Sequence, residues 1–291
     1  MAPDIGDQGY DDYSRAAWRA RGGADAEVPV PAGEPVSGDE VSEIYAPLVR
    51  FVHERIAGSG AAGRPFVIGI TGSVASGKST SARVLRALLE GAADGQSGSV
   101  AHVTTDGFLW PNAVLEARGI MARKGFPESY DTEGLAAFLA ALRSGAAEVR
   151  APRYSHETYD VVPGDGIVVQ GASMVIVEGV NVLQPALAGP TGEAFDLALY
   201  VDAAEADLER WYVTRLFGLR DEARRDSGSY FGFLLERSDD EVRDFALSIW
   251  RNVNLVNLRE HIAPTRPRAH VVLDKGPDHA ITRVRVRRTG R

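Results

Sequence analysis

The chain has no cysteine among its 291 residues. Disulfides, thiolate zinc sites and cysteine nucleophiles are therefore excluded. It also lacks an apolar run long enough to span a bilayer and an apolar N-terminal segment of the signal-peptide kind, so we expect a soluble cytoplasmic protein with no membrane partner. Basic residues are in the minority, with 32 Lys and Arg against 40 Asp and Glu and a net charge of −8. That balance argues against nucleic acid as a partner.

One glycine-rich motif stands out in this sequence. Residues Gly72 to Ser79 fit the pattern Gly-x-x-x-x-Gly-Lys-[Ser/Thr] of a phosphate-binding P-loop. The apolar stretch Phe66 to Ile70 precedes the motif, and a helical stripe of valine and leucines follows it. This order of strand, loop and helix favours a P-loop over a chance glycine-rich turn. The residues that we expect to bind the nucleotide here are Gly72, Ser73, Val74, Ala75, Ser76, Gly77, Lys78, Ser79 and Thr80.

The chemistry of such a loop explains its residue types. Glycines let the backbone turn successive N–H groups toward phosphate oxygens, and the following helix adds its positive N-terminal end. Lys78 would reach the β- and γ-phosphates, and Ser79 would hold Mg²⁺. The motif therefore predicts that the chain binds a nucleoside triphosphate.

Further apolar runs predict the other strands of one sheet. They are Val100 to Thr104, Met174 to Val177, Phe195 to Val201 and His270 to Leu273. Helical periodicity appears between them, from Leu208 to Leu219 and from Val242 to Val253. We therefore predict an α/β fold, a P-loop NTPase three-layer sandwich with a mostly parallel central sheet flanked by helices. Ligands should lie at the carboxyl ends of its strands.

The two ends of the chain differ from this pattern. Residues 1–38 are rich in Gly, Ala, Pro and Asp, so we expect a poorly ordered segment there and one kinase-like P-loop domain over residues 39–291. The exception is the stretch Tyr13 to Trp18, whose aromatic pair could dock on the body of the protein. Near the C-terminus, Arg283 to Arg288 alternates arginine with valine, which predicts an edge strand with a charged outer face.

Two carboxylates follow predicted strands. Asp106 would face the same strand ends as the P-loop, where it could accept a proton from an attacking hydroxyl or help to organise Mg²⁺. The alternative is that Asp106 only caps a turn with Gly107. Glu178 ends an apolar strand, a position that orders Mg²⁺ or its water shell in P-loop proteins, and the alternative is a solvated loop residue.

Two later segments carry candidate substrate contacts. The segment Pro152 to Asp160 holds two tyrosines and a histidine without periodicity. It fits a loop that contacts a substrate and, equally well, an edge hairpin with aromatic packing. Arginines from Arg215 to Arg225 could clamp a carboxylate or phosphate, because guanidinium suits planar bidentate recognition. A solvated helix face is the alternative for most of them.

Taken in their order along the chain, the segments described above resemble those of the bacterial type I pantothenate kinases, a family of P-loop kinases. The similarity covers roughly residues Val41 to Arg288. Besides the P-loop, it rests on Val103 to Asn112, Lys124 to Asp131, Tyr154-Ser155-His156 with Tyr159-Asp160, Glu178 to Gln184, Trp211-Tyr212 with Arg215, Ile249-Trp250 with Asn254, and Pro264 to Ala269.

The resemblance implies ATP-dependent phosphorylation of the primary hydroxyl of pantothenate, the first step of coenzyme A biosynthesis. At matching positions, Lys78 and Ser79 would serve ATP and Mg²⁺, and the strand-end position of Glu178 already makes it the second expected metal-binding residue. Asp106 would act as the catalytic base, assisted by Lys78. The residues implied to contact pantothenate are Asp106, Tyr154, His156, Tyr159, Tyr212, Arg215 and Asn254.

The same resemblance implies regulation and assembly. The family is dimeric and is inhibited by coenzyme A in competition with ATP, so we expect a homodimer and this inhibitor here. Arg83 and His156 match positions associated with the inhibitor, and Arg83 joins the nucleotide-binding residues. Leu219 stands where the family often has an aromatic residue near the thiol end of the inhibitor, which predicts weaker inhibition.

Two other functions stay open at this point. One is a related P-loop kinase that acts on uridine or ribulose phosphate, against which the blocks typical of pantothenate kinases argue. The other is a nucleotide-binding paralogue without turnover. Such a protein has no chemical need for Lys78, Ser79, Asp106 and Glu178 together.

Overall fold

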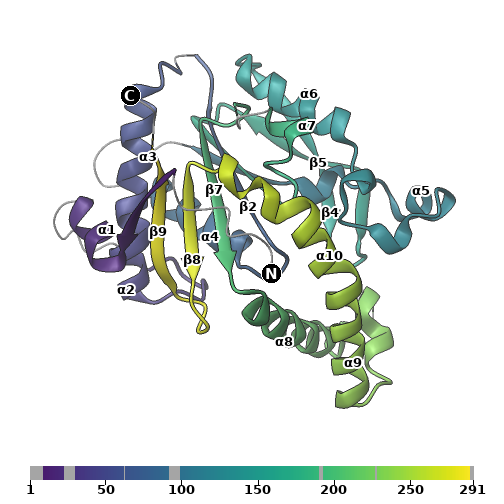
Figure 1. Ribbon diagram of the computed structural model, residues 1–291. Helices are drawn as coiled ribbons and strands as arrows, with labels where there is room; N and C mark the ends of the chain where they lie inside the picture. The colour runs from purple at the N-terminus through teal and green to yellow at the C-terminus, as the bar shows by residue number, and fades with distance from the viewer. Residues whose placement is uncertain are drawn as a thin grey trace.

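A computed structural model describes residues 9–22, 30–61, 63–91, 99–189, 193–226 and 228–288 (Figure 1). These residues form a seven-stranded sheet in the order β1-β9-β8-β7-β2-β6-β3. The strands are β1 (Tyr10–Ser14), β2 (Phe66–Gly72), β3 (Val100–Thr104), β6 (Met174–Glu178), β7 (Leu197–Ala203), β8 (Val271–Lys275) and β9 (Ile281–Arg287). The pairs from β8 to β3 are parallel, and β9 pairs antiparallel with both β8 and β1. The predicted mostly parallel sheet is confirmed.

The central strands form because their residues are apolar toward both faces. Every residue of β2 and of β6 is buried, as a strand covered on both sides requires. Side chains alternate between the faces, so that Ile68 and Ile70 join one core and Val67 joins the other. The apolar runs in the sequence therefore located these strands correctly.

Helices cover both faces of this sheet, which gives the predicted three layers (Figure 1). One core includes side chains of α1 (Arg15–Arg21), α3 (Ala46–Gly58) and α4 (Lys78–Glu90). The opposite core includes side chains of α6 (Thr132–Arg143), α7 (Pro185–Ala188) and α8 (Glu205–Ala223). Beyond the sheet, α8 and α9 (Asp239–Ile249) project as a pair with a small core of their own (Figure 1). No helix in the described ranges is both long enough and apolar enough to cross a membrane.

Short helical segments complete the described chain. They are α2 (Gly38–Glu40), η1 (Val41–Tyr45), η2 (Thr105–Phe108), α5 (Asn112–Ala117), η3 (Met121–Arg123), η4 (Pro127–Ser129), η5 (Tyr230–Leu234), η6 (Trp250–Asn254), α10 (Leu255–Asn257), η7 (Leu258–Ile262) and η8 (Ala263–Arg268). The run from α9 through η7 continues as one helical path and returns to the sheet before β8 (Figure 1).

A separate hairpin stands beside the main sheet. It consists of β4 (Glu148–Ser155) and β5 (Asp160–Gln170), which pair antiparallel. The hairpin lies against η2, where a Cβ added to Gly107 would come within 2.0 Å of the carbonyl oxygen of Pro152. Glycine is therefore required at position 107, because only it allows this close approach of two backbones. The segment Pro152 to Asp160 is thus a hairpin end, as one of the two sequence interpretations had it.

The N-terminal segment departs from its expected description. The division into a poorly ordered segment 1–38 and a domain 39–291 is wrong for β1 and α1, which belong to the main sheet and its core. Trp18 is fully buried, donates its indole N–H to the carbonyl oxygen of Ile44 at 3.1 Å, and lies 5.6 Å from the ring of Tyr13. The expected docking of this aromatic pair is confirmed. Residues 1–8 and 23–29 lie outside the described residues.

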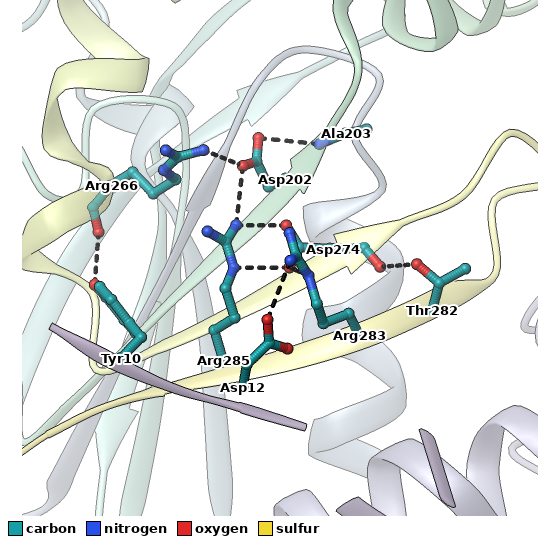
Figure 2. A network of polar contacts seen from close by, with 9 residues as sticks. All are labelled: Tyr10, Asp12, Asp202, Ala203, Arg266, Asp274, Thr282, Arg283 and Arg285. Carbon is teal, nitrogen blue, oxygen red and sulfur yellow. Dashed lines mark hydrogen bonds and ion pairs between the residues drawn. The ribbon is translucent and has the colours of Figure 1, made fainter. Parts of the chain in front are cut away.

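The expected edge position of the C-terminal strand is also wrong. Strand β9 lies between β8 and β1, so its edge is paired. Figure 2 shows that Arg283 and Arg285 of β9 face carboxylates of β1 and β8. Arg285 is 4% exposed and binds Asp274 with 2.5 Å between Nη2 and Oδ1. Through Arg283 and Asp12, this network ties β1 to the rest of the sheet.

Candidate active site

The P-loop joins the end of β2 to the start of α4. Its backbone takes positive φ angles at Gly72 (152°), Ala75 (65°) and Gly77 (85°), which turn the chain tightly. A Cβ on Gly72 would lie 2.5 Å from the carbonyl oxygen of Val201, so only glycine fits there. A Cβ on Gly77 would lie 2.5 Å from the ammonium nitrogen of Lys275. The sequence motif therefore has the strand, loop and helix that a phosphate site needs.

Polar groups of this loop are left without partners inside the protein. Within the described residues, the hydroxyl oxygens of Ser73 and Ser76 are buried and make no hydrogen bond. Gly77 begins α4 without a side-chain cap, so no side chain caps the amides of its first turn. Because buried polar groups normally have partners, the loop fits a ligand rich in hydrogen-bond acceptors, such as a phosphate chain.

Ser79 and Glu178 offer oxygen ligands beside the loop. Glu178 is 5% exposed at the end of β6 and hydrogen-bonds to Ser79. Burial raises the pKa of Glu178, while Lys78 and the Ser79 hydrogen bond act in the opposite direction. In the described part of the chain, no group of three or more His, Cys, Asp or Glu could hold a metal. The residues fit Mg²⁺, which takes few protein ligands and completes its shell with water and phosphate oxygens.

Asp106 lies on η2, directly after β3. Thr104 caps this turn by accepting a hydrogen bond from the Asp106 amide at 3.3 Å, so the carboxylate of Asp106 is not the cap. The hydroxyl of Tyr130 lies 3.5 Å from Oδ1 of Asp106. Burial, followed by the charge of Asp106, raises the pKa of Tyr130 well above its usual value. Tyr130 therefore stays a neutral hydrogen-bond donor toward this carboxylate.

The turn between β4 and β5 brings three expected substrate residues together. The ring of Tyr154 lies 5.2 Å from that of His156 and 6.2 Å from that of Tyr159, between centroids. Tyr159 has a φ of 53°, and its carbonyl oxygen accepts hydrogen bonds from Lys124 at 2.5 Å and from Asn112 at 3.1 Å. These contacts hold the turn beside η2 and Asp106.

Lys124 is a residue to which the sequence assigned no role. Its ammonium lies 4.0 Å from the ring centroid of Tyr159 and 5.1 Å from that of Tyr154. Burial lowers the pKa of Lys124 to about 8, against the opposing charges of Asp160 and Asp106. A cation thus lies among the aromatic rings of the hairpin turn.

Three further expected contacts come from α8 and η6. Tyr212 lies on α8 and hydrogen-bonds to Asn254, the last residue of η6. Burial raises the pKa of Tyr212, while Asn254 and the nearby charge of Arg215 lower it. Arg215 follows Tyr212 by three residues and is exposed, and no carboxylate of the described chain pairs with it. Its guanidinium is therefore available to an anionic ligand.

Charged groups from both halves of the site act on the pKa of His156. Burial lowers the pKa of His156, Asp106 opposes this effect, and Arg215 and Lys78 lower the pKa further. The P-loop lysine, the carboxylate after β3 and the arginine of α8 therefore all act on one imidazole. The P-loop after β2 and Asp106 after β3 lie at the same edge of the sheet, where the carboxyl ends of these parallel strands meet.

Two more contributions were missed in the sequence. Tyr230 of η5 stacks on Tyr159 with ring centroids 4.7 Å apart, and its amide donates to the carbonyl oxygen of Glu157 at 2.8 Å. The ammonium group of Lys275 lies against Gly77 of the P-loop. Lys275 also lines a cavity of about 600 Å³ at the ends of β7 and β8. Neither contact has a local signal, because the partners are far apart along the chain. Arg83 lies further along α4, where it pairs with Glu34.

Comparisons with known proteins identify the family and the fold. Residues 67–226 match the family described as "Phosphoribulokinase / Uridine kinase family". A pantothenate kinase from Sorangium cellulosum strain So ce56 is 48% identical, over 96% of this chain and 98% of that protein. One from Streptomyces avermitilis is 44% identical, over 96% and 93%. The solved D-glycerate 3-kinase from Cryptococcus neoformans shares the fold alone, with a TM-score of 0.57, 13% identity and coverage of 80% and 96%.

The similarities to the two pantothenate kinases extend over nearly the whole chain. The chain belongs to the pantothenate kinases, within the phosphoribulokinase and uridine kinase family of P-loop proteins.

Proposed function

We propose that this chain transfers the γ-phosphoryl group of ATP to the primary hydroxyl of pantothenate and so makes 4′-phosphopantothenate for coenzyme A biosynthesis. The activity named for its relatives, which are 48% and 44% identical over 96% of the chain, supports this assignment. The structural observation that carries it is that the P-loop follows β2 and Asp106 follows β3, two parallel strands on either side of β6 whose carboxyl ends lie at the same edge of the sheet. A donor phosphate site and an anion-binding acceptor site then face each other.

On the nucleotide side, the chain positions phosphates and neutralises their charge. The amides of the P-loop and the ammonium of Lys78 bind phosphate oxygens, and the unpaired hydroxyls of Ser73 and Ser76 supply further donors. Ser79 and Glu178 would hold Mg²⁺, which when bound neutralises charge on the phosphates. Most of the catalysis of phosphoryl transfer comes from such positioning.

On the acceptor side, Asp106 handles the proton. The pantothenate hydroxyl oxygen attacks the γ-phosphorus, Asp106 accepts the hydroxyl proton, and the bond from the γ-phosphorus to the β–γ bridging oxygen breaks to release ADP. Arg215 binds the substrate carboxylate at the far end. The remaining wall of the pocket is formed by Tyr154, His156, Tyr159, Tyr212 and Asn254.

A panel of acceptors tests this function. We expect ADP formation from ATP to depend on pantothenate, with uridine, ribulose 5-phosphate and D-glycerate giving at most background rates. Dependence on uridine or ribulose 5-phosphate would assign the related kinase activity instead. ATP binding without ADP formation from any acceptor would indicate a nucleotide-binding protein without turnover.

Regulation and assembly are part of the same proposal. Coenzyme A would bind in competition with ATP, because the P-loop and the cations Lys78 and Arg83 attract any nucleotide phosphate. Coenzyme A would pack against Leu219 at a position where the family often has an aromatic ring. Because leucine makes the weaker contact, inhibition would be weaker. We further propose a cytoplasmic homodimer. Sedimentation of the purified protein measures its mass and so tests whether it is a dimer.

A further inference from the structure

An ion pair joins the N-terminal segment to α4, the helix that follows the P-loop. Both carboxylate oxygens of Glu34 accept from Arg83, with 2.6 Å from Nε to Oε1 and 3.0 Å from Nη2 to Oε2. Arg83 lies on α4, five residues after Lys78, and its Nη2 is 3.5 Å from Oγ1 of Thr80. A residue from the segment between α1 and α2 thus fixes a cation close to the P-loop.

The two partners differ in burial. The side chain of Glu34 is 13% exposed, whereas that of Arg83 is 47% exposed. Removing the partner of a carboxylate so far from water costs much free energy, because it leaves an unpaired buried charge. Glu34 therefore keeps its bond to Arg83 when a ligand arrives. The Nη1 group of Arg83 has no partner among the described residues, and it therefore remains available to an anion.

The position of Glu34 is itself held by the fold. Its carbonyl oxygen accepts from the Val36 amide at 2.9 Å. Further along the same segment, the hydroxyls of Tyr45 and Ser81 are 3.0 Å apart, which ties η1 to α4. The charge of Arg83 also reaches the metal-binding carboxylate, since it contributes to lowering the pKa of Glu178 against the larger effect of burial.

We propose that Glu34 is a positioning residue of the nucleotide site, which orients Arg83 so that its free edge binds a phosphate group of ATP or coenzyme A. The inference rests on the proposed function only in assigning Arg83 to nucleotide phosphates. It gives the N-terminal segment a part in ligand binding that composition alone did not indicate.

Direct binding measurements test this role without any acceptor, so they are independent of whether pantothenate is the substrate. Calorimetric titration of ADP and of coenzyme A into Glu34→Gln should show dissociation constants raised about three- to tenfold, and Arg83→Ala should show a similar rise. Glu34→Asp should recover part of the affinity. In the Arg83→Ala background, Glu34→Gln should have no further effect, which a merely structural role would not produce.

Matched controls separate positioning from loss of a surface ion pair. Glu90→Gln removes the partner of Arg86 on the same helix, at 3.1 Å, and should leave both affinities unchanged. Adenosine, which carries no phosphate, should bind Glu34→Gln and the unmodified protein equally. Unchanged or tighter binding of ADP to Glu34→Gln, with Arg83→Ala weakened, would overturn the positioning role. Unchanged binding to Arg83→Ala would overturn the inference together with the assignment of Arg83.

Discussion

At the scale of the residue, the proposed chemistry depends most on Asp106. It is near the neutral donor Tyr130, and its charge acts on Tyr154, Tyr159 and His156. We expect Asp106→Asn to lower kcat by a factor of about 10²–10⁴ with little change in the KM for ATP, because the variant cannot accept the hydroxyl proton. Steady-state kinetics with both substrates varied measure this effect.

The comparison variant for Asp106→Asn is Lys78→Ala. Because Lys78 neutralises phosphate charge, its loss should weaken ATP binding as well as turnover, which separates the two roles. A kcat near normal in Asp106→Asn would remove the base assignment from this carboxylate.

Arg215 is the residue whose proposed role is most specific to the acceptor. Arg215→Ala should raise the KM for pantothenate about 10- to 100-fold, because a charge-assisted hydrogen bond to the substrate carboxylate is lost. N-alkyl pantothenamides lack that carboxylate, so their KM should change little. Arg224→Ala is the control at the C-terminal end of the same helix, since Arg224 pairs with Asp221 at 2.6 Å. Equal losses for the two acceptors would indicate a structural or transition-state role for Arg215.

Residues were predictable from sequence where their function depends on a local motif. Lys78 and Ser79 follow from a loop whose geometry requires glycine at fixed positions. Lys124 and Tyr230 had no such signal, because their contacts with Tyr159 cross long stretches of chain. The resemblance to a known family named the substrate residues, and the structure brings three of them, Tyr154, His156 and Tyr159, together at the hairpin turn.

At the scale of the element, β1 and α1 are the parts that composition described least well. Trp18 of α1 is fully buried between Tyr13, Phe51 and the backbone of Ile44. We expect Trp18→Ala to lower the free energy of unfolding by about 3–5 kcal/mol, since it removes a large buried side chain. Urea denaturation followed by circular dichroism measures the change.

The control for Trp18→Ala is Trp110→Ala, since Trp110 is only partly buried and stacks on Arg118 at 4.4 Å. That variant should lose clearly less stability. An unfolding free energy unchanged by Trp18→Ala would restore a domain boundary near residue 38.

The difference between predicted and unpredicted elements has a physical cause. Strands β2 and β6 are buried on both faces, so their continuous apolar residues identify them. Strand β1, with the sequence Tyr-Asp-Asp-Tyr-Ser, is held by pairing with β9 and by ion pairs such as Asp12 with Arg283. Neither of these long-range contacts leaves a periodic pattern, and without β1 the arginines of β9 suggested an exposed edge.

At the scale of the whole molecule, regulation offers a further test. Coenzyme A should raise the apparent KM for ATP without lowering the maximal rate, because both ligands would use the P-loop and its neighbouring cations. Initial rates at several fixed coenzyme A concentrations measure this. An apparent KM unchanged at millimolar coenzyme A would show that feedback is absent, and the inhibitor assignments of Arg83 and His156 would then be withdrawn.

The central claim is that one site joins a phosphate-donor half from the P-loop to an acceptor half from the hairpin, α8 and η6. The measurement that tests it most directly is product identification by ³¹P NMR and mass spectrometry after incubation with ATP, Mg²⁺ and pantothenate. We expect a phosphomonoester on the primary hydroxyl of pantothenate, formed in equal amount to ADP and lost in Asp106→Asn. ADP formed without a phosphorylated pantothenate, or no ADP at all, would contradict it.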